Sequence, residues 1–507
     1  MMPIHRRDFI KQLSTLAVLA GVSPWVPRLY GAESPKQPAY LAGYEQAWRD
    51  NPLAANTQWF RNAGLGLFMH YGLNAVSETH TWYMYGKYYD QNGKVAQRAP
   101  VPIREFEQLA DRFTCEDFNA DFITDLALEA GCKYVNITTR HHDGFCLWDS
   151  ASEPFNAKNA AGKRDLLGEL SVACEKKGLA LLPYWSIARD WRHPHAPPEG
   201  RPPYEQYLGK PDPRYAGKSE YNIEIYNEFI RNQITELFTQ YKIAGIWFDG
   251  VGIGRPRQQD LHLHELYQWI HSQWPGALIS YKNGVTGTED FLACEGELSG
   301  ADFFDPTFFK LVDRDVPREI CSNLGSSWAW VKQFASATQH EGRLWKNLSK
   351  ARAQHANWLM NTGPMPSGKI NPVHVNAYRT IGQLIKSRGL PSQQGDEYEA
   401  TQDEIVASLA KKMVSKGFLR RLDGTQEEKA TAGTILANYV FSRNLPPACT
   451  VRKSSYMAAA MSLCDEYPTK YKGGKVYPEV RKLLETGDWN IVNDDQNGGL
   501  IKSIEKE

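Results

Sequence analysis

The feature that most constrains the fold of this chain is a repeated alternation between short apolar runs and amphipathic stretches over residues 57–390. Apolar runs with the length of buried strands occur at residues 66–70, 133–139, 179–185, 244–249 and 277–281. Apolar residues at helical spacing occur at residues 119–131, 165–177, 221–241 and 261–274. Strands that alternate with helices build a parallel sheet, so we expect an α/β fold, either a barrel or a doubly wound sheet.

Polar residues at the ends of the expected strands favour the barrel. His70, His141, Tyr184, Asp249 and Lys282 each come at or just after the carboxyl end of a different expected strand. In a barrel these ends converge on one face, where active sites are built. The sequence also lacks the Gly-rich phosphate loop that a nucleotide-binding open sheet would carry. We therefore predict a (β/α)8-like TIM barrel as the catalytic domain, over residues 57–391.

The two flanks of this domain have a different character. Residues 5–11 read HRRDFIK and precede an apolar run over 13–22, a pattern typical of a twin-arginine export signal, which we assign to residues 1–32. The run is too short to span a bilayer comfortably, so we expect an exported protein, periplasmic or extracellular, with no further membrane association. Residues 33–56 are interpreted as a linker. Residues 392–507 are predicted to be mainly helical, because helix-start patterns such as TQEE at 425–428 replace the apolar runs.

Composition excludes some classes of partner. Lys plus Arg (58) balances Asp plus Glu (58), so no net positive charge is present to hold a nucleic acid. The eight cysteines form no Cys-x-x-Cys pair, which indicates neither a zinc site nor a dense disulfide framework. Fifteen Trp and 25 Tyr supply flat faces of the kind on which sugar rings stack, although aromatic residues mostly fill cores. The oligomeric state is not predicted.

Three segments carry a family resemblance: FMHYG at 68–72, TRHHDGFCLWDS at 139–150 and IWFDG at 246–250. Together with NTGPMPSG at 361–368, they make the chain closely resemble the α-L-fucosidases of glycoside hydrolase family 29, over roughly residues 57–390. The resemblance implies a (β/α)8-like barrel that hydrolyses terminal α-L-fucosyl residues of fucosylated glycans with retention of configuration. It implies that neither a metal nor another cofactor is needed.

A retaining glycosidase needs a carboxylate nucleophile and a second carboxyl group that acts first as an acid and then as a base. Asp249 ends an expected buried strand and is the predicted nucleophile; the alternative is a turn residue before Gly250. By resemblance, the acid/base follows the next strand, and Glu295 is the expected residue. Glu297 and Glu289 remain alternatives.

The three histidines are interpreted as substrate-binding residues. Imidazole offers both a hydrogen-bond donor and an acceptor in a rigid ring, which suits contacts from His70, His141 and His142 to sugar hydroxyls. A metal cluster is a competing interpretation, but the spacing matches no standard zinc motif. Because adjacent strand residues point to opposite faces, one histidine could instead serve the scaffold.

Three further residues complete the expected site. By resemblance, Tyr184 and Trp247 contact the sugar; the alternative is core packing. Lys282 stands where many relatives carry Arg, which exchanges a planar fork of donors for a single ammonium group. Two other functions stay open at this stage: a barrel that binds fucosylated glycans without cleaving them, and an exo-glycosidase for a galactose-configured sugar.

Overall fold

The computed structural model describes residues 36–200, 221–254, 256–295, 316–353 and 355–392, and the backbone of two strands near the carboxyl terminus. The expected export signal over residues 1–32 lies outside the described residues. Most of the expected helical region over 392–507 does so too. The described strands there, β11 (Asn490–Asp494) and β12 (Gly499–Glu505), pair in antiparallel fashion, which the expectation of a mainly helical region did not include.

Eight parallel strands form the central sheet, in the order β7-β6-β5-β4-β1-β10-β9-β8. They are β1 (Leu65–Met69), β4 (Tyr134–Arg140), β5 (Ala180–Ser186), β6 (Gly245–Asp249), β7 (Leu278–Tyr281), β8 (Leu292–Glu295), β9 (Arg318–Asn323) and β10 (Ala356–Thr362). The end strands β7 and β8 meet through a bridge between Lys282 and Ala293, just beyond β7. The sheet is therefore a nearly closed barrel, which confirms the predicted fold class.

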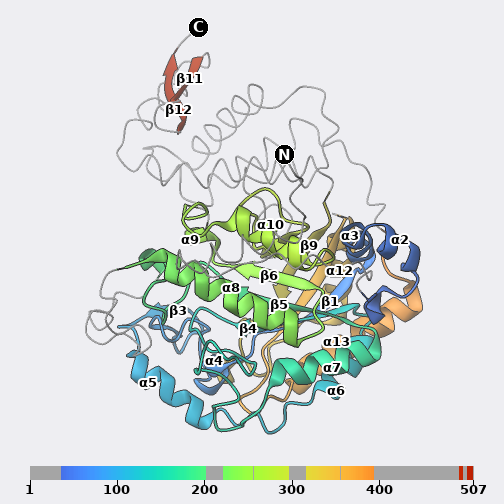
Figure 1. Ribbon diagram of the computed structural model, residues 1–507. Helices are drawn as coiled ribbons and strands as arrows, with labels where there is room; N and C mark the ends of the chain where they lie inside the picture. The colour runs from blue at the N-terminus through green and yellow to red at the C-terminus, as the bar shows by residue number, and fades with distance from the viewer. Residues whose placement is uncertain are drawn as a thin grey trace, which may run out of the picture. The chain divides into compact units, whose positions relative to one another are not determined.

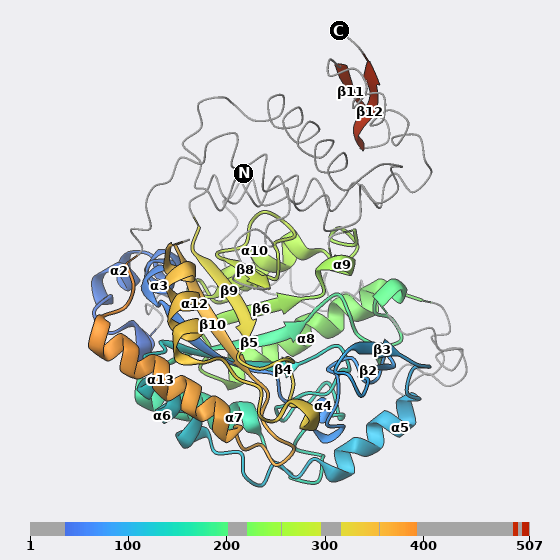
Figure 2. The same ribbon diagram turned by 180° about the vertical axis from the view of Figure 1, so that it is seen from behind.

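Helices cover the outside of these strands (Figures 1 and 2). The larger ones are α6 (Ala120–Glu129), α7 (Leu166–Lys177), α8 (Ile223–Gln240), α10 (Leu263–Gln273), α12 (Glu341–Ala353) and α13 (Pro372–Arg388). Neighbouring helices contact one another, α7 with α6, α6 with α13 and α13 with α12. Residues 282–291 join β7 to β8 without a helix, so the barrel departs from eight regular repeats.

Local sequence sets the ends of these helices. The Asp165 carboxylate accepts the backbone N–H of Gly168 at 2.8 Å and begins α7, which ends at Gly178 in the left-handed conformation, with a φ of 68°. Asn119 and Asn222 begin α6 and α8 in the same way. The apolar spacing of the sequence predicted four of the larger helices, and the structure confirms them: α6, α7, α8 and α10.

Smaller elements occupy the connections. They are η1 (Ala39–Leu41), α2 (Glu45–Asp50), α4 (Leu73–Val76), β2 (Lys87–Tyr89), β3 (Val95–Gln97), α5 (Ile103–Glu107), η2 (Gln108–Arg112), η3 (Pro198–Gly200), α9 (Val251–Gly254) and η7 (Lys332–Phe334). Among the described residues, no helix combines the length and apolar character needed to cross a bilayer.

The segment interpreted as a linker, residues 33–56, is largely helical where it is described. Helix α3 (Pro52–Asn62) begins within it and packs against the amino ends of the strands. The Asn56 amide donates to the carbonyl oxygens of Ala244 and Gly276, at 3.1 and 2.8 Å, just before β6 and β7. Phe60 contacts the Tyr134 ring in the barrel interior, with centroids 5.3 Å apart. These contacts make α3, which begins within the expected linker at Pro52, part of the barrel.

Alternation along the strands separates the barrel interior from the layer beneath the helices. Phe68, Tyr184, Trp247 and Leu359 belong to one buried cluster inside the barrel. The intervening residues, such as Phe248 on β6, join the larger cluster between strands and helices. The interior is therefore a packed aromatic core, and it forms the floor of the face on which the carboxyl ends of the strands meet.

Candidate active site

A cavity of about 120 Å³ lies at the carboxyl ends of the barrel strands. Every substrate-binding and catalytic residue proposed from the sequence lines it: His70, His141, His142, Tyr184, Trp247, Asp249, Lys282 and Glu295. These side chains come from the ends of six strands, β1, β4, β5, β6, β7 and β8. The structure thus brings together residues that are up to 225 positions apart in the sequence.

Asp249, at the end of β6, is the most firmly held acid in this cavity. Its Oδ2 accepts the Tyr184 hydroxyl at 2.7 Å, and its Oδ1 accepts the Gly250 N–H at 2.6 Å and lies 2.7 Å from Lys282 Nζ. Burial alone would raise the pKa of Asp249, but the Lys282 charge and the three hydrogen bonds outweigh it and hold the pKa below its ordinary value. Asp249 is therefore a buried, ionised carboxylate with a fixed orientation.

Lys282 connects Asp249 to Glu295. Its Nζ lies 2.6 Å from Glu295 Oε2, at the end of β8. Burial lowers the pKa of Lys282, but the two neighbouring carboxylates outweigh burial and raise it above its ordinary value. The distance between Asp249 Oδ1 and Glu295 Oε2 therefore cannot exceed the sum of their distances to Lys282 Nζ. The pair therefore faces one small space, and the Glu295 side chain is the more exposed of the two, at 36% against 6%.

The sequence left Glu289 and Glu297 as alternatives to Glu295 for the acid/base. Glu289 is fully buried, and its carboxylate accepts backbone N–H groups from Val285, Thr286 and Gly287 at 2.9 to 3.0 Å. It organises the turn between β7 and β8 and does not line the cavity. Glu297 lies outside the described residues.

The three histidines present nitrogen atoms at the cavity in neutral rings. Burial lowers the pKa of His70 to about 3 and those of His141 and His142 well below the ordinary value. His70 Nδ1–H donates to Asn361 Oδ1 at 2.7 Å, which leaves Nε2 as an acceptor. His141 Nδ1 has no hydrogen-bond partner within the described part of the chain.

His142 shows most clearly what these rings could bind. The Ser186 hydroxyl donates to the carbonyl of Arg189, so His142 Nδ1–H donates to Ser186 Oγ at 2.6 Å. The remaining nitrogen, Nε2, is then an acceptor that lies 3.9 Å from Asp249 Oδ2, which also accepts. Asp249 Oδ2 already accepts the Tyr184 hydroxyl, so Nε2 of His142 is the acceptor to which a sugar hydroxyl in the cavity can donate.

The alternative that His141 and His142 point to opposite faces does not agree with the structure. Strand β4 ends at Arg140, and its register against β5 already shifts between Thr138 and Arg140. Both rings follow that irregularity and line the same cavity, with centroids 4.1 Å apart. Strict strand alternation does not extend into the turn that follows.

The rest of this motif builds the turn itself. Arg140 and Asp190 form a fully buried ion pair at 2.6 Å, and Asp143 accepts the N–H of Phe145 at 2.9 Å. Gly144 has a φ of 79°, and a Cβ there would lie 3.0 Å from Arg140 Nη2. The Arg-His-His-Asp-Gly run therefore places two histidines in the cavity, and its other residues hold the turn that carries them.

Tyr184 and Trp247 form the aromatic wall, stacked with ring centroids 5.4 Å apart. The Tyr184 hydroxyl donates to Asp249, whereas the Trp247 Nε1–H donates to Glu319 Oε1 at 2.8 Å. Each ring thus lines the cavity while its polar atom is engaged by the protein. Glu319 was not selected from the sequence.

Five other cavity residues were also not selected from the sequence: Phe68, Thr81, Trp82, Cys321 and Trp328. Trp82 lies in the connection after β1, edge-on to His142 with centroids 5.5 Å apart. Trp328 follows β9, and its ring centroid lies 4.8 Å from that of His70. Trp82 and Trp328 lie outside helices and strands, where hydrophobic periodicity predicts nothing. Of the five residues, Phe68 alone belongs to a segment that carried the family resemblance, FMHYG at 68–72.

Comparisons with known proteins identify relatives of this chain. A family model described as alpha-L-fucosidase matches residues 33–390. The tissue alpha-L-fucosidase of Bos taurus is 26% identical over 340 residues, which cover 65% of this chain and 67% of the relative. The plasma alpha-L-fucosidase of Rattus norvegicus is 25% identical over 398 residues, 74% of this chain and 80% of the relative.

Solved structures share the fold. Alpha-L-fucosidase isoenzyme 1 from Paenibacillus thiaminolyticus matches with a TM-score of 0.56 and 24% identity, covering 67% of this chain and 77% of that chain. Alpha-L-fucosidase AlfC from Lactobacillus casei, in complex with alpha-L-fucose product, matches with a TM-score of 0.50 and 23% identity, covering 66% and 98%.

Proposed function

Because the chain belongs to the α-L-fucosidase family and is therefore a glycoside hydrolase, we propose that Asp249 and Glu295 remove terminal α-L-fucosyl residues from glycans by double displacement, with retention of configuration. Asp249 is the nucleophile and Glu295 the general acid/base. His70, His141, His142, Tyr184, Trp247 and Lys282 hold the sugar or the nucleophile in place.

The observation that carries the mechanism is the pair of carboxylates bridged by Lys282. Retaining glycosidases place their two carboxyl groups roughly 5 to 5.5 Å apart, whereas inverting enzymes leave a wider gap for water. Because one Nζ contacts both carboxylates, at 2.7 and 2.6 Å, the bridged oxygens of Asp249 and Glu295 lie closer together than the gap of inverting enzymes. This spacing supports direct attack by Asp249 on the sugar.

In the first step, Asp249 Oδ attacks the anomeric carbon and the bond from that carbon to the leaving oxygen breaks. Glu295 gives its proton to the leaving oxygen, so a glycosyl ester on Asp249 and a free alcohol result. In the second step, Glu295 takes a proton from water, whose oxygen attacks the anomeric carbon and releases Asp249. The sugar leaves with its original configuration, and both acids regain their starting states.

The surroundings of Asp249 fit this role. A nucleophile must be ionised, and Lys282 keeps Asp249 so despite burial. The neutral histidines supply acceptors and donors of fixed direction to a sugar that carries no charge of its own. Removal from bulk water strengthens each of these contacts.

Hydrolysis of an aryl α-L-fucoside, with an aryl β-D-galactoside as the matched comparison, tests the proposal. We expect turnover of the fucoside in large excess over the galactoside, with α-L-fucose as the first product seen by NMR before mutarotation. Release of β-L-fucose first would contradict retention. Preference for the galactoside, or fucose binding without turnover of either substrate, would contradict the proposed activity.

A further inference from the structure

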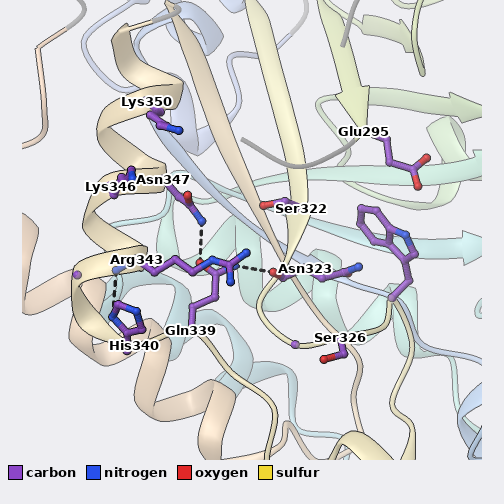
Figure 3. Close-up of a pocket in the computed structure, with 13 residues that line it drawn as sticks. Glu295, Ser322, Asn323, Ser326, Gln339, His340, Arg343, Lys346, Asn347 and Lys350 are labelled. Carbon is purple, nitrogen blue, oxygen red and sulfur yellow. Dashed lines mark hydrogen bonds between the residues drawn. The ribbon is translucent and has the colours of Figure 1, made fainter. Parts of the chain in front are cut away.

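A second cavity, of about 810 Å³, adjoins the small one. Glu295 and Trp328 line both, so the two spaces meet at the proposed acid/base. Figure 3 shows this cavity, with Glu295 on one side and the side chains of α12 on the other. Because Glu295 protonates the leaving oxygen in the proposed mechanism, the sugar that bears that oxygen must extend to the Glu295 side of the site.

Helix α12 gives this cavity a positive wall. Arg343, Lys346 and Lys350 line it at three- and four-residue spacing, which places them along one side of the helix. Arg343 and Lys346 are exposed, and neither forms an ion pair with any carboxylate of the described chain. Their charges are therefore available to a ligand.

The other described residues that line the cavity are mostly polar and uncharged. Among these described lining residues Glu295 is the one acid, and Lys282 already contacts its carboxylate at 2.6 Å. Asn347 Nδ2–H donates to Gln339 Oε1 at 2.8 Å, and Gln339 Nε2–H donates to the carbonyl of Asn323 at 2.7 Å. This chain of amides, visible in Figure 3, fixes the wall between α12 and β9.

We propose that this cavity binds the leaving-group side of the substrate and selects a glycan whose leaving-group sugar carries an anionic substituent, a sulfate ester or a carboxylate. The inference rests on the proposed function and adds a substrate class to it. A cleft lined by charges of one sign concentrates ligands of the opposite sign. The Arg343 guanidinium offers paired donors that match the oxygens of either anion, and Lys346, one turn along α12, adds a second charge.

Kinetics on matched disaccharides test this inference. The substrates are an α-L-fucosyl galactoside, the same disaccharide with a 6-sulfate on galactose, and its counterpart with galacturonate in place of galactose. We expect a higher kcat/KM, mainly through a lower KM, for at least one anionic substrate than for the neutral one, and a preference that falls as salt rises. The sulfated and carboxylated arms show which anion the cavity accepts.

Variants locate the preference. Arg343→Gln and Lys346→Gln should each reduce the ratio of kcat/KM for the anionic over the neutral substrate by about threefold or more, within the range for exposed ion pairs. Lys386→Gln is the matched control, since Lys386 is an exposed lysine on α13 that lines neither cavity. We expect this control to keep the wild-type ratio.

The outcomes separate this inference from the proposed function. Wild-type turnover of the neutral disaccharide or of an aryl fucoside, with no preference for either anionic substrate, would overturn the inference and leave the proposed function standing. A preference that persists in both α12 variants would overturn it too, because the selecting charge would lie elsewhere. Absence of turnover on every fucoside would contradict the proposed function itself.

Discussion

Trp247, which lines the cavity at the ends of the barrel strands, donates its indole N–H to Glu319, 2.8 Å away. The Tyr134 hydroxyl donates to the other oxygen of the same carboxyl group. Glu319 is fully buried, and burial raises its pKa to about 7 even though both hydrogen bonds lower it. One wall of the proposed sugar site thus depends on a buried acid that titrates near neutrality.

We predict that Glu319→Gln changes how stability varies with pH. Because the folded-state pKa of Glu319 is raised, its contribution to folding is greatest below its ordinary pKa and is lost as pH rises through about 7. The wild type should therefore lose on the order of 2 kcal/mol more than Glu319→Gln between pH 5 and 8, seen by denaturant unfolding. Glu228→Gln, at an exposed position of α8, is the control; parallel curves for wild type and Glu319→Gln would refute the assignment.

A second prediction concerns Lys282, which holds the pKa of Asp249 down. Lys282→Met should raise that pKa and move the acid limb of the kcat/KM profile to higher pH, by roughly one unit or more. Lys282→Arg keeps the charge and should leave the limb near its wild-type position. An acid limb that stays in place in Lys282→Met would mean that Lys282 does not control the ionisation of the nucleophile.

Much of the fold was predictable because the first five strands of the barrel are apolar and separated by helices. The expected runs match β1, β4, β5, β6 and β7 to within one residue at each end. Strands β8, β9 and β10 were not predicted. Strand β8 follows β7 without an intervening helix, β9 begins with the charged Arg318 and Glu319, and Asn357 and Asn361 interrupt the apolar pattern of β10.

The candidate site was predictable where side chains sit at strand ends, since barrel geometry brings those ends together. Trp82 and Trp328 were missed because connections between strands place them, and no short-range pattern reports where a connection folds back. Glu319 was missed because its role depends on Tyr134 and Trp247, which lie 185 and 72 positions away. Such pairings follow from packing of the barrel interior.

The third prediction tests Glu295 through leaving-group chemistry. An acid that protonates the leaving oxygen matters greatly for a poor leaving group and little for one that is stable as an anion. Glu295→Ala should therefore hydrolyse a fucosyl disaccharide very slowly while still forming the intermediate from a dinitrophenyl fucoside. Because Glu295 also activates water, added azide should speed release of the intermediate as a fucosyl azide.

Two neighbouring acids serve as comparisons for this experiment. Glu289→Ala should lower stability, by about 1 to 3 kcal/mol for each backbone N–H left without its acceptor, and should show neither leaving-group dependence nor azide rescue. Glu297→Ala should behave as the wild type does. Azide rescue in Glu297→Ala or Glu289→Ala, and not in Glu295→Ala, would move the acid/base role to that residue.

The central claim is that Asp249 forms a covalent bond to the sugar, and trapping that bond tests it most directly. A fluorinated fucoside that reacts quickly and releases slowly should accumulate as an ester on the enzyme, and mass spectrometry of the digested protein should place the added mass on Asp249. Asp249→Ala should stay folded, take up no label and lose nearly all turnover. A label on any other residue, or full turnover by Asp249→Ala, would contradict the account.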